Sequence, residues 1–234
     1  MSKYAFIFAR GGSKSLKKKN IKIFGGKPLI AHSILHAFES NIFDKVFVST
    51  EDDEIANISS VYGAEIIKRP NNLADDGSPE WLAWQHAIFH AEDRFGSFEY
   101  FVSLPATSPL RDIEDILKAV NHLDTDKSAD LCLGISQSNH SPFFNMVIKN
   151  ECNYIDLAIN TEKSINRRQD APNIFNITTV VYAARTDFIK NSDNIFSGTV
   201  IGVEIPKERA VDIDDIIDFQ FAEFLYNQSN HVKK

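Results

Sequence analysis

Short apolar runs alternate along most of this chain with segments whose apolar side chains recur three and four residues apart. The runs predict strands at residues 4–9, 45–49, 64–68, 100–104 and 130–136, and later at 177–183 and 199–205. The helical spacing predicts helices at residues 28–39, 52–62, 79–94, 112–123 and 214–226. Because strands alternate with helices, we predict an α/β fold whose mostly parallel central sheet is covered on both faces.

The alternation stops at residue 136 and resumes near residue 178. Residues 136–177 offer two short strand-like runs and polar turns but no helical pattern. We therefore predict one α/β domain built from residues 1–135 and 178–234, with residues 136–177 inserted as an arm.

The 234 residues are 43% hydrophobic and 24% charged, with a net charge of −7. This composition predicts a soluble globular protein and argues against general nucleic-acid binding. No apolar run approaches the length of a membrane span, and the first apolar run is too short for a signal peptide. Cys132 and Cys152 form no CxxC pair, which favours two reduced thiols in a cytoplasmic protein.

Positive charge is concentrated near the beginning of the chain. No Asp or Glu precedes Glu39, whereas the first 38 residues hold eight Lys and Arg side chains. Many of them lie in "ARGGSKSLKKKNI", residues 9–21, directly after the first predicted strand. Adjacent glycines and an arginine fork suit a bound polyphosphate, although neither a Walker loop nor GxGxxG is present. The alternative is a glycine turn with solvated lysines.

This loop, followed in order by "GGKPLI", "VFVSTEDDEIA", "YGAEIIKRP", "LPATSPLR", "RRQDAP" and "ERAVDIDD", resembles the CMP-sialic acid synthetases. The resemblance runs from Tyr4 to about Leu225. It implies a Rossmann-like, three-layer nucleotidyltransferase fold and a homodimer formed through the arm. It also implies an enzyme that transfers CMP from CTP to a nine-carbon keto-sugar acid, with Mg²⁺, for bacterial surface glycans.

The resemblance also implies roles for individual residues. Arg10 and Lys19 match groups that contact the triphosphate, and the loop is expected to read cytosine partly through its backbone. Further expected substrate-binding residues lie in the loop, in the turn at residues 75–80, after the central strand and on the arm: Gly11, Gly12, Ser13, Asn20, Ser78, Thr107, Ser108, Arg111, Arg168 and Gln169.

Asp212 and Asp214 match the family's metal-binding pair. Hard Mg²⁺ prefers oxygen ligands, and a spacing of two points both side chains the same way in an extended segment. Asp212 is also the candidate general base. The alternative is that "DIDD" only caps the last helix, where Asp is favoured.

Departures from the family surround the acceptor. Pro105 and Ala106 stand where many relatives have a glutamine before "PTSPLR". The turn "DDGSPE", residues 75–80, stands where the N-acetylneuraminate enzymes have "SDTASS". A legionaminic acid or another nonulosonic acid is therefore a rival to N-acetylneuraminate. Two rival functions are a metal-dependent glycosyltransferase using DxD and a nucleotide-binding subunit that has lost catalysis.

Overall fold

The computed structural model describes residues 1–75, 77–160, 167 and 170–232. Within them, seven strands form one sheet in the order β11-β7-β10-β6-β1-β4-β5. All neighbouring pairs are parallel except those of β10, which runs antiparallel to both β6 and β7. The strands are β1 (Lys3–Phe8), β4 (Lys45–Thr50), β5 (Glu65–Lys68), β6 (Tyr100–Ser103), β7 (Leu131–Gln137), β10 (Phe175–Arg185) and β11 (Val200–Glu204). The predicted strands and the mostly parallel sheet are thus confirmed.

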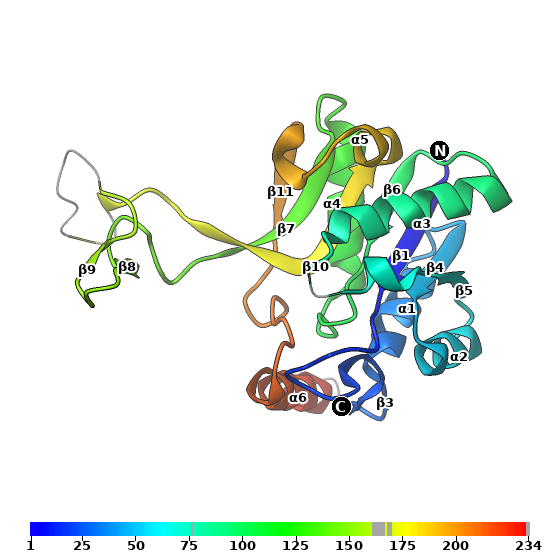
Figure 1. Cartoon of the computed structure of the whole chain (residues 1–234), viewed down its shortest axis with the longest axis horizontal. Coiled ribbons are helices and arrows are strands. Elements are labelled where there is room, and N and C mark those ends of the chain that lie inside the picture. The colour runs from blue at the N-terminus through cyan, green and yellow to red at the C-terminus, as the bar shows by residue number, and fades with distance from the viewer. Residues whose placement is uncertain (76, 161–166, 168–169, 233–234) are drawn as a thin grey trace.

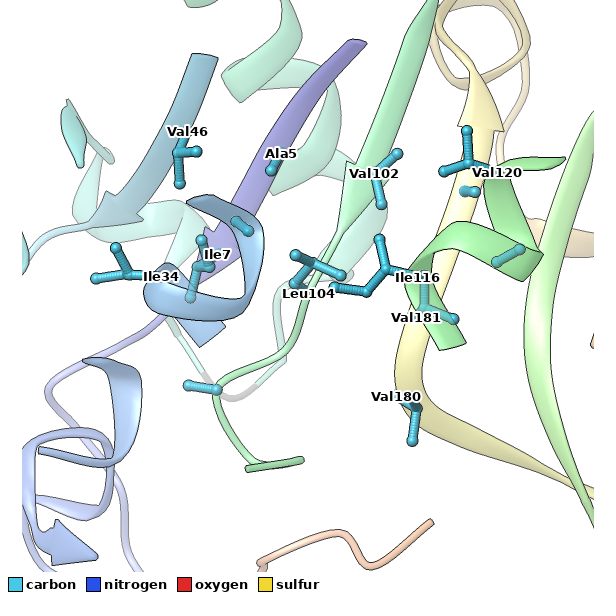
Figure 2. Packing of buried hydrophobic residues seen from close by; sticks show 14 of the residues in the cluster. Ala5, Ile7, Ile34, Val46, Val102, Leu104, Ile116, Val120, Val180 and Val181 are labelled. Atoms are coloured by element: carbon cyan, nitrogen blue, oxygen red, sulfur yellow. The ribbon is translucent and has the colours of Figure 1, made fainter. Parts of the chain in front are cut away.

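Helices cover both faces of this sheet (Figure 1). Successive side chains of a strand point to opposite faces, so each central strand contributes apolar residues to two cores. Ala5 and Ile7 of β1 join the core beneath α1 (Leu29–Glu39), α2 (Asp53–Val61) and α4 (Ile113–Thr125), part of which Figure 2 shows. Tyr4 and Phe6 join a second core beneath α3 (Glu80–Phe95) and α5 (Thr186–Asn191). The three-layer α/β architecture is therefore confirmed, although α5 was not predicted.

Helix starts follow the expected chemistry. Asp52 accepts a hydrogen bond from the amide of Ile55 at the start of α2, and Asp112 forms a capping box with Asp115 at the start of α4. Such caps satisfy amides that have no partner within the helix. They fix the points at which the chain leaves the carboxyl edge of the sheet.

A third, smaller core joins residues 16–29 to the C-terminal segment, and Figure 1 shows α6 beside β3. Phe24 and Leu29 pack there with Phe219 and Ala222 of α6 (Ile216–Val232). The chain between β1 and α1 contains η1 (Lys19–Ile21), β2 (Ile23–Phe24) and β3 (Lys27–Pro28). This packing holds the beginning of α6 next to the basic loop. Two further short elements are η2 (Asn71–Leu73) and η4 (Ile195–Ser197).

The segment between β7 and β10 projects away from the body of the molecule (Figure 1). Its described part contains a two-stranded antiparallel sheet of β8 (Val147–Lys149) and β9 (Ile155–Leu157). The assignment of residues 136–177 as an inserted arm that forms a dimer stays a prediction. Among the described helices, none is both long and apolar enough to cross a bilayer.

Candidate active site

The basic loop leaves the carboxyl end of β1 and is anchored by its own polar groups. Asn20, only 7% exposed, donates from Nδ2 to the carbonyl of Arg10 at 3.0 Å, and so closes the loop on itself. The amide of Gly11 donates to Glu51 Oε1 at 2.7 Å. A Cβ on Gly11 would lie 2.3 Å from Asp52 Oδ2, whereas a Cβ on Gly12 would meet nothing within 4 Å. Gly11 is thus required by its protein neighbours, and Gly12 faces open space.

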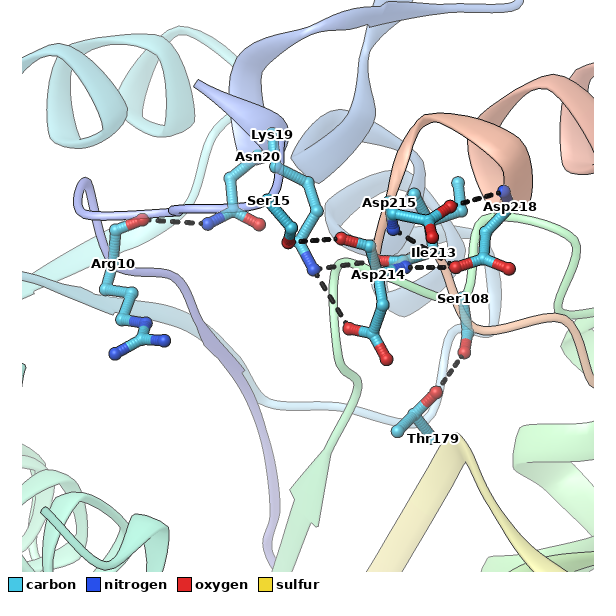
Figure 3. A network of polar contacts seen from close by, with 10 residues as sticks. All are labelled: Arg10, Ser15, Lys19, Asn20, Ser108, Thr179, Ile213, Asp214, Asp215 and Asp218. Atoms are coloured by element: carbon cyan, nitrogen blue, oxygen red, sulfur yellow. Dashed lines mark hydrogen bonds and ion pairs between the residues drawn. The ribbon is translucent and has the colours of Figure 1, made fainter. Parts of the chain in front are cut away.

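The loop is tied directly to the late aspartate segment (Figure 3). Ser15 Oγ donates to the carbonyl of Asp214 at 2.7 Å. Lys19 Nζ donates to the carbonyl of Ile213 at 2.7 Å and lies 3.2 Å from Asp214 Oδ1. These contacts join residues that are almost 200 positions apart in the sequence. The structure therefore brings the cationic and anionic clusters together at one edge of the sheet.

Capping of α6 belongs to a different aspartate. Asp215 Oδ1 accepts from the amides of Ile217 at 2.8 Å and Asp218 at 3.0 Å. Asp218 Oδ2 in turn accepts from the amides of Asp214 and Asp215. The side chains of Asp212 and Asp214 therefore take no part in these capping bonds.

Asp212 carries the features of a functional carboxylate. Its Oδ1 atom is buried with no hydrogen-bond partner among the described residues. Burial raises the pKa of Asp212, the charge of Asp214 adds to the rise, and the hydroxyls of Thr107 and Thr179 offset part of it. An orphaned buried carboxylate oxygen beside a second, largely exposed carboxylate fits a hard cation such as Mg²⁺.

The described residues include no group of three or more His, Cys, Asp or Glu side chains arranged to hold a metal ion. Two carboxylates suffice for Mg²⁺, which usually keeps several waters and takes its remaining ligands from substrate phosphates. The two carboxylates are thus compatible with Mg²⁺.

The turn after β6 contacts the late aspartate segment. The carbonyl of Thr107 accepts from the amide of Ile213 at 2.9 Å, and the hydroxyls of Ser108 and Thr179 lie 2.7 Å apart. Arg111 is only 2% exposed; it donates to Ser33 Oγ at 2.9 Å and to the carbonyl of Pro105 at 2.8 Å. In this structure the buried guanidinium of Arg111 is engaged by protein partners and ties the turn to Ser33 and to the carbonyls of Pro105 and Val180.

Two groups near the loop were not picked out as site residues by the sequence. The buried Arg69 donates to Glu51 Oε2 at 2.9 Å, so that Glu51 bridges Arg69 and the amide of Gly11. Glu80 begins α3 and accepts from the indole of Trp84 at 3.2 Å. Arg69 directly follows β5, and Glu80 begins the next α-helix along the chain. Both therefore lie after a strand end at the carboxyl edge of the sheet, a position that could have identified them from the sequence.

Ser13 lies within the basic loop, and Ser78 lies in the turn before α3. The amide of Ser13 donates to the carbonyl of Gly11, and Ser78 lines a cavity together with Arg10. Arg168 and Gln169 lie outside the described residues. The substrate-binding roles of Ser13, Ser78, Arg168 and Gln169, like those of the other site residues, stay predictions.

The sequence is similar to proteins of a known family. The family model described as "Cytidylyltransferase" matches residues 4–230. Over 227 residues, the chain is 31% identical to the post-translational flagellin modification protein B of Campylobacter coli, covering 96% of this chain and 94% of the relative. It is 32% identical over 226 residues to the CMP-N,N'-diacetyllegionaminic acid synthase of Campylobacter jejuni, with coverages of 96% and 94%.

A solved structure of CMP:2-keto-3-deoxy-manno-octonic acid synthetase complexed with CTP superimposes with a TM-score of 0.73. It covers 97% of this chain and 100% of its own, at 16% identity. At that identity the match concerns the fold, and it agrees with the nucleotidyltransferase architecture predicted from the sequence.

Proposed function

The chain belongs to the cytidylyltransferase family, and we propose that it transfers CMP from CTP to a nonulosonic acid, releasing pyrophosphate. The identity to a relative named for a legionaminic acid supports an acceptor of that class. The departures from "SDTASS" and from the glutamine before the central turn also favour an acceptor other than N-acetylneuraminate.

The observation that carries the proposal is the joining of the loop at residues 10–20 to the segment at residues 212–214. Lys19 touches both the carbonyl of Ile213 and the carboxylate of Asp214, while Ser15 holds the carbonyl of Asp214. A triphosphate bears about four negative charges and needs cationic groups that are already in place before an oxygen nucleophile can approach. Arg10 and Lys19 would provide them.

The reaction is an in-line displacement at the α-phosphorus. The anomeric hydroxyl of the sugar acid attacks, the bond to the β-phosphate oxygen breaks, and pyrophosphate leaves. Asp212 and Asp214 would hold Mg²⁺, which when bound neutralises phosphate charge and acidifies a nearby hydroxyl. Asp212 is also the candidate to take the hydroxyl proton, since its buried Oδ1 has no hydrogen-bond partner among the described residues.

The assembly belongs to the same proposal. We place the enzyme in the cytoplasm as a homodimer, joined through the arm at residues 136–177 and supplying activated sugar for surface glycans. Several apolar side chains of the arm are exposed in the single chain: Met146, Val147, Ile148, Tyr154, Ile155 and Ile159. A second copy of the arm would cover them.

The test is pyrophosphate release in a mixture of the full chain, CTP, Mg²⁺ and each member of a panel of sugar acids. The panel holds N-acetylneuraminate, a diacetyllegionaminate, a pseudaminate and the eight-carbon keto-deoxy-octonate. Release with at least one nine-carbon acid, and none without acceptor, is expected. No release with any of them would contradict the proposal. In a separate incubation with a CMP-sugar in place of CTP, cleavage of that nucleotide sugar would favour a glycosyltransferase.

A further inference from the structure

A cavity of about 320 Å³ opens beside the basic loop, on the side of β1 and β5. Its lining comes from the end of β1, the residue after β5, η2 and the start of α3. The cavity shares Arg10 with the loop, so a molecule whose phosphates lie on that loop can extend into it. Its volume suits a small ligand or part of one.

The charges of the cavity determine which end of a nucleotide it can take. Glu80 and Asp75 contribute carboxylates to its lining. A triphosphate beside these carboxylates would meet like charge, and the Arg69 side chain in the cavity is already paired with Glu51. Arg10, which the cavity shares with the loop, and Lys19 instead attract phosphate onto the loop. The uncharged end of a nucleotide, its base, is therefore the part that fits against Glu80.

The walls agree with this orientation. Phe8, Leu73 and Ala83 supply apolar surface for the faces of a flat ring. Arg69 lines the same cavity, and its guanidinium is fixed by Glu51, which also holds the amide of Gly11. Apolar walls with a few fixed polar groups are typical of sites that bind small planar ligands.

Glu80 is held in a defined position. Its Oε1 accepts from the indole N–H of Trp84 at 3.2 Å. Trp84 is only 2% exposed and packs against Phe101 and Tyr182, with ring centroids 5.2 and 5.5 Å away. A carboxylate has about four acceptor positions, so Glu80 keeps acceptor capacity for a ligand while the indole fixes its rotamer.

We propose that Glu80 selects the base of the nucleotide by accepting a hydrogen bond from the 4-amino group of cytosine. The inference rests on the proposed use of CTP and adds a side chain to the backbone contacts expected from the loop. Uracil presents a carbonyl oxygen at the same position, which would face the carboxylate with no proton between them. A carboxylate that accepts from cytosine N4 is an established form of base readout, and a buried unpaired acceptor is costly.

The experiment compares CTP with UTP in the wild-type chain, in Glu80→Gln and in a matched control, Asp93→Asn. Asp93 is an exposed carboxylate near the other end of α3. A glutamine has the same shape, and its Oε1 can keep the bond from the Trp84 indole while its Nε2 donates to uracil O4. Two measurements are made: binding of each nucleotide by calorimetry, and kcat/KM for pyrophosphate release with the preferred sugar acid.

We expect the wild type and Asp93→Asn to prefer CTP, and Glu80→Gln to lower the CTP:UTP ratio about 10- to 100-fold. Glu80→Ala removes both the hydrogen bond to cytosine N4 and the repulsion of uracil O4, so it should weaken CTP binding and also narrow the difference between CTP and UTP. An equal loss for both nucleotides in Glu80→Gln would overturn the inference, because it would place the carboxylate away from the base. So would a wild type that binds CTP and UTP equally.

Binding calorimetry tests the base selectivity independently of the proposed transfer reaction. A chain that discriminates CTP from UTP in binding but releases no pyrophosphate would leave the base readout standing and contradict the proposed transfer. Glu80 lies at the exposed start of a helix, so Glu80→Gln should fold. An unchanged melting temperature for this variant checks that it does.

Discussion

The carboxyl edge of the sheet and the projecting arm are built in opposite ways. At the edge, residues from both ends of the chain are joined by Lys19, Ser15 and the carbonyls of residues 213 and 214. In the arm, apolar side chains such as Ile148, Tyr154 and Ile155 are 61%, 72% and 62% exposed. One chain is sufficient to assemble the edge, whereas these apolar side chains of the arm stay exposed in the single chain. Substitutions at the edge should therefore change catalysis most, and substitutions in the arm should change the oligomeric state most.

The largest effect is expected at the edge, from Asp212→Asn. Loss of a carboxylate proposed to hold metal and accept a proton should lower kcat about 100- to 1,000-fold. At the same time the melting temperature should rise by about 2 °C, because the substitution removes a half-buried charge whose pKa is raised by burial. Activity assays and calorimetry measure the two effects.

Asp215→Ala is the control for this substitution. It removes the cap of α6 and should cost about 1 kcal/mol of stability while retaining most activity. If both aspartate variants lost stability and kept turnover, "DIDD" would have only a capping role.

Arg10→Ala should follow in size. Its carbonyl, which the Asn20 side chain holds, is retained in the variant, so the loop should stay closed while kcat/KM falls about 100-fold. Lys18→Ala is the control, since Lys18 lies in the same loop and is paired with Glu54 at 2.5 Å. Equal kinetics for the two variants would show that positive charge in general, rather than Arg10, binds the triphosphate.

In the arm, the double substitution Ile148→Ser and Ile155→Ser should convert a dimer into monomers at micromolar concentration, since it removes apolar contact area. Light scattering coupled to gel filtration measures the mass. Activity should fall only about 10-fold if the partner assists the acceptor site, less than at Asp212. Phe196→Ser, at an exposed aromatic side chain outside the arm, should change neither. A wild type that is already monomeric would refute the proposed role of the arm.

Two adjacent glycines separate folding from binding at the edge. Gly11→Ala places a methyl group 2.3 Å from Asp52 Oδ2 and should cost about 1–3 kcal/mol of unfolding free energy. Gly12→Ala meets open space and should leave the melting temperature nearly unchanged, while raising KM for CTP if the nucleotide lies against it. Equal destabilisation by both would contradict the geometry of the loop.

The smallest effect is a pH dependence. A carboxyl whose pKa is raised in the folded state binds its proton more tightly there, so its contribution to stability falls as pH rises above its ordinary value of about 3.8. The stability difference between Asp212→Asn and wild type should therefore be near zero at about pH 3 and grow toward neutral pH. Denaturant titrations at several pH values would measure it; a difference that shrinks with rising pH would contradict the burial of Asp212.

Much of this arrangement could be predicted from the sequence because it depends on local patterns. Alternating apolar runs specify the strands, and the basic loop is visible because acidic residues are absent around it. The antiparallel direction of β10 could not be predicted, since it depends on where a long insertion returns to the sheet.

The participation of Glu51 and Arg69 could not be predicted from spacing either. They meet only because β4 and β5 are neighbours, and the alternation alone does not set strand order. Likewise, "TSPLR" marked an important turn, but only the tertiary structure shows that Arg111 is buried beneath it.

The central claim is that the loop and the late aspartates act on one nucleotide. A double-mutant cycle of Arg10→Ala with Asp212→Asn, scored by kcat/KM for pyrophosphate release, tests it most directly. Groups that serve the same transition state are strongly non-additive, so the double variant should be little worse than the more damaged single variant. Losses that simply multiply would show that the two clusters act independently and would contradict the account.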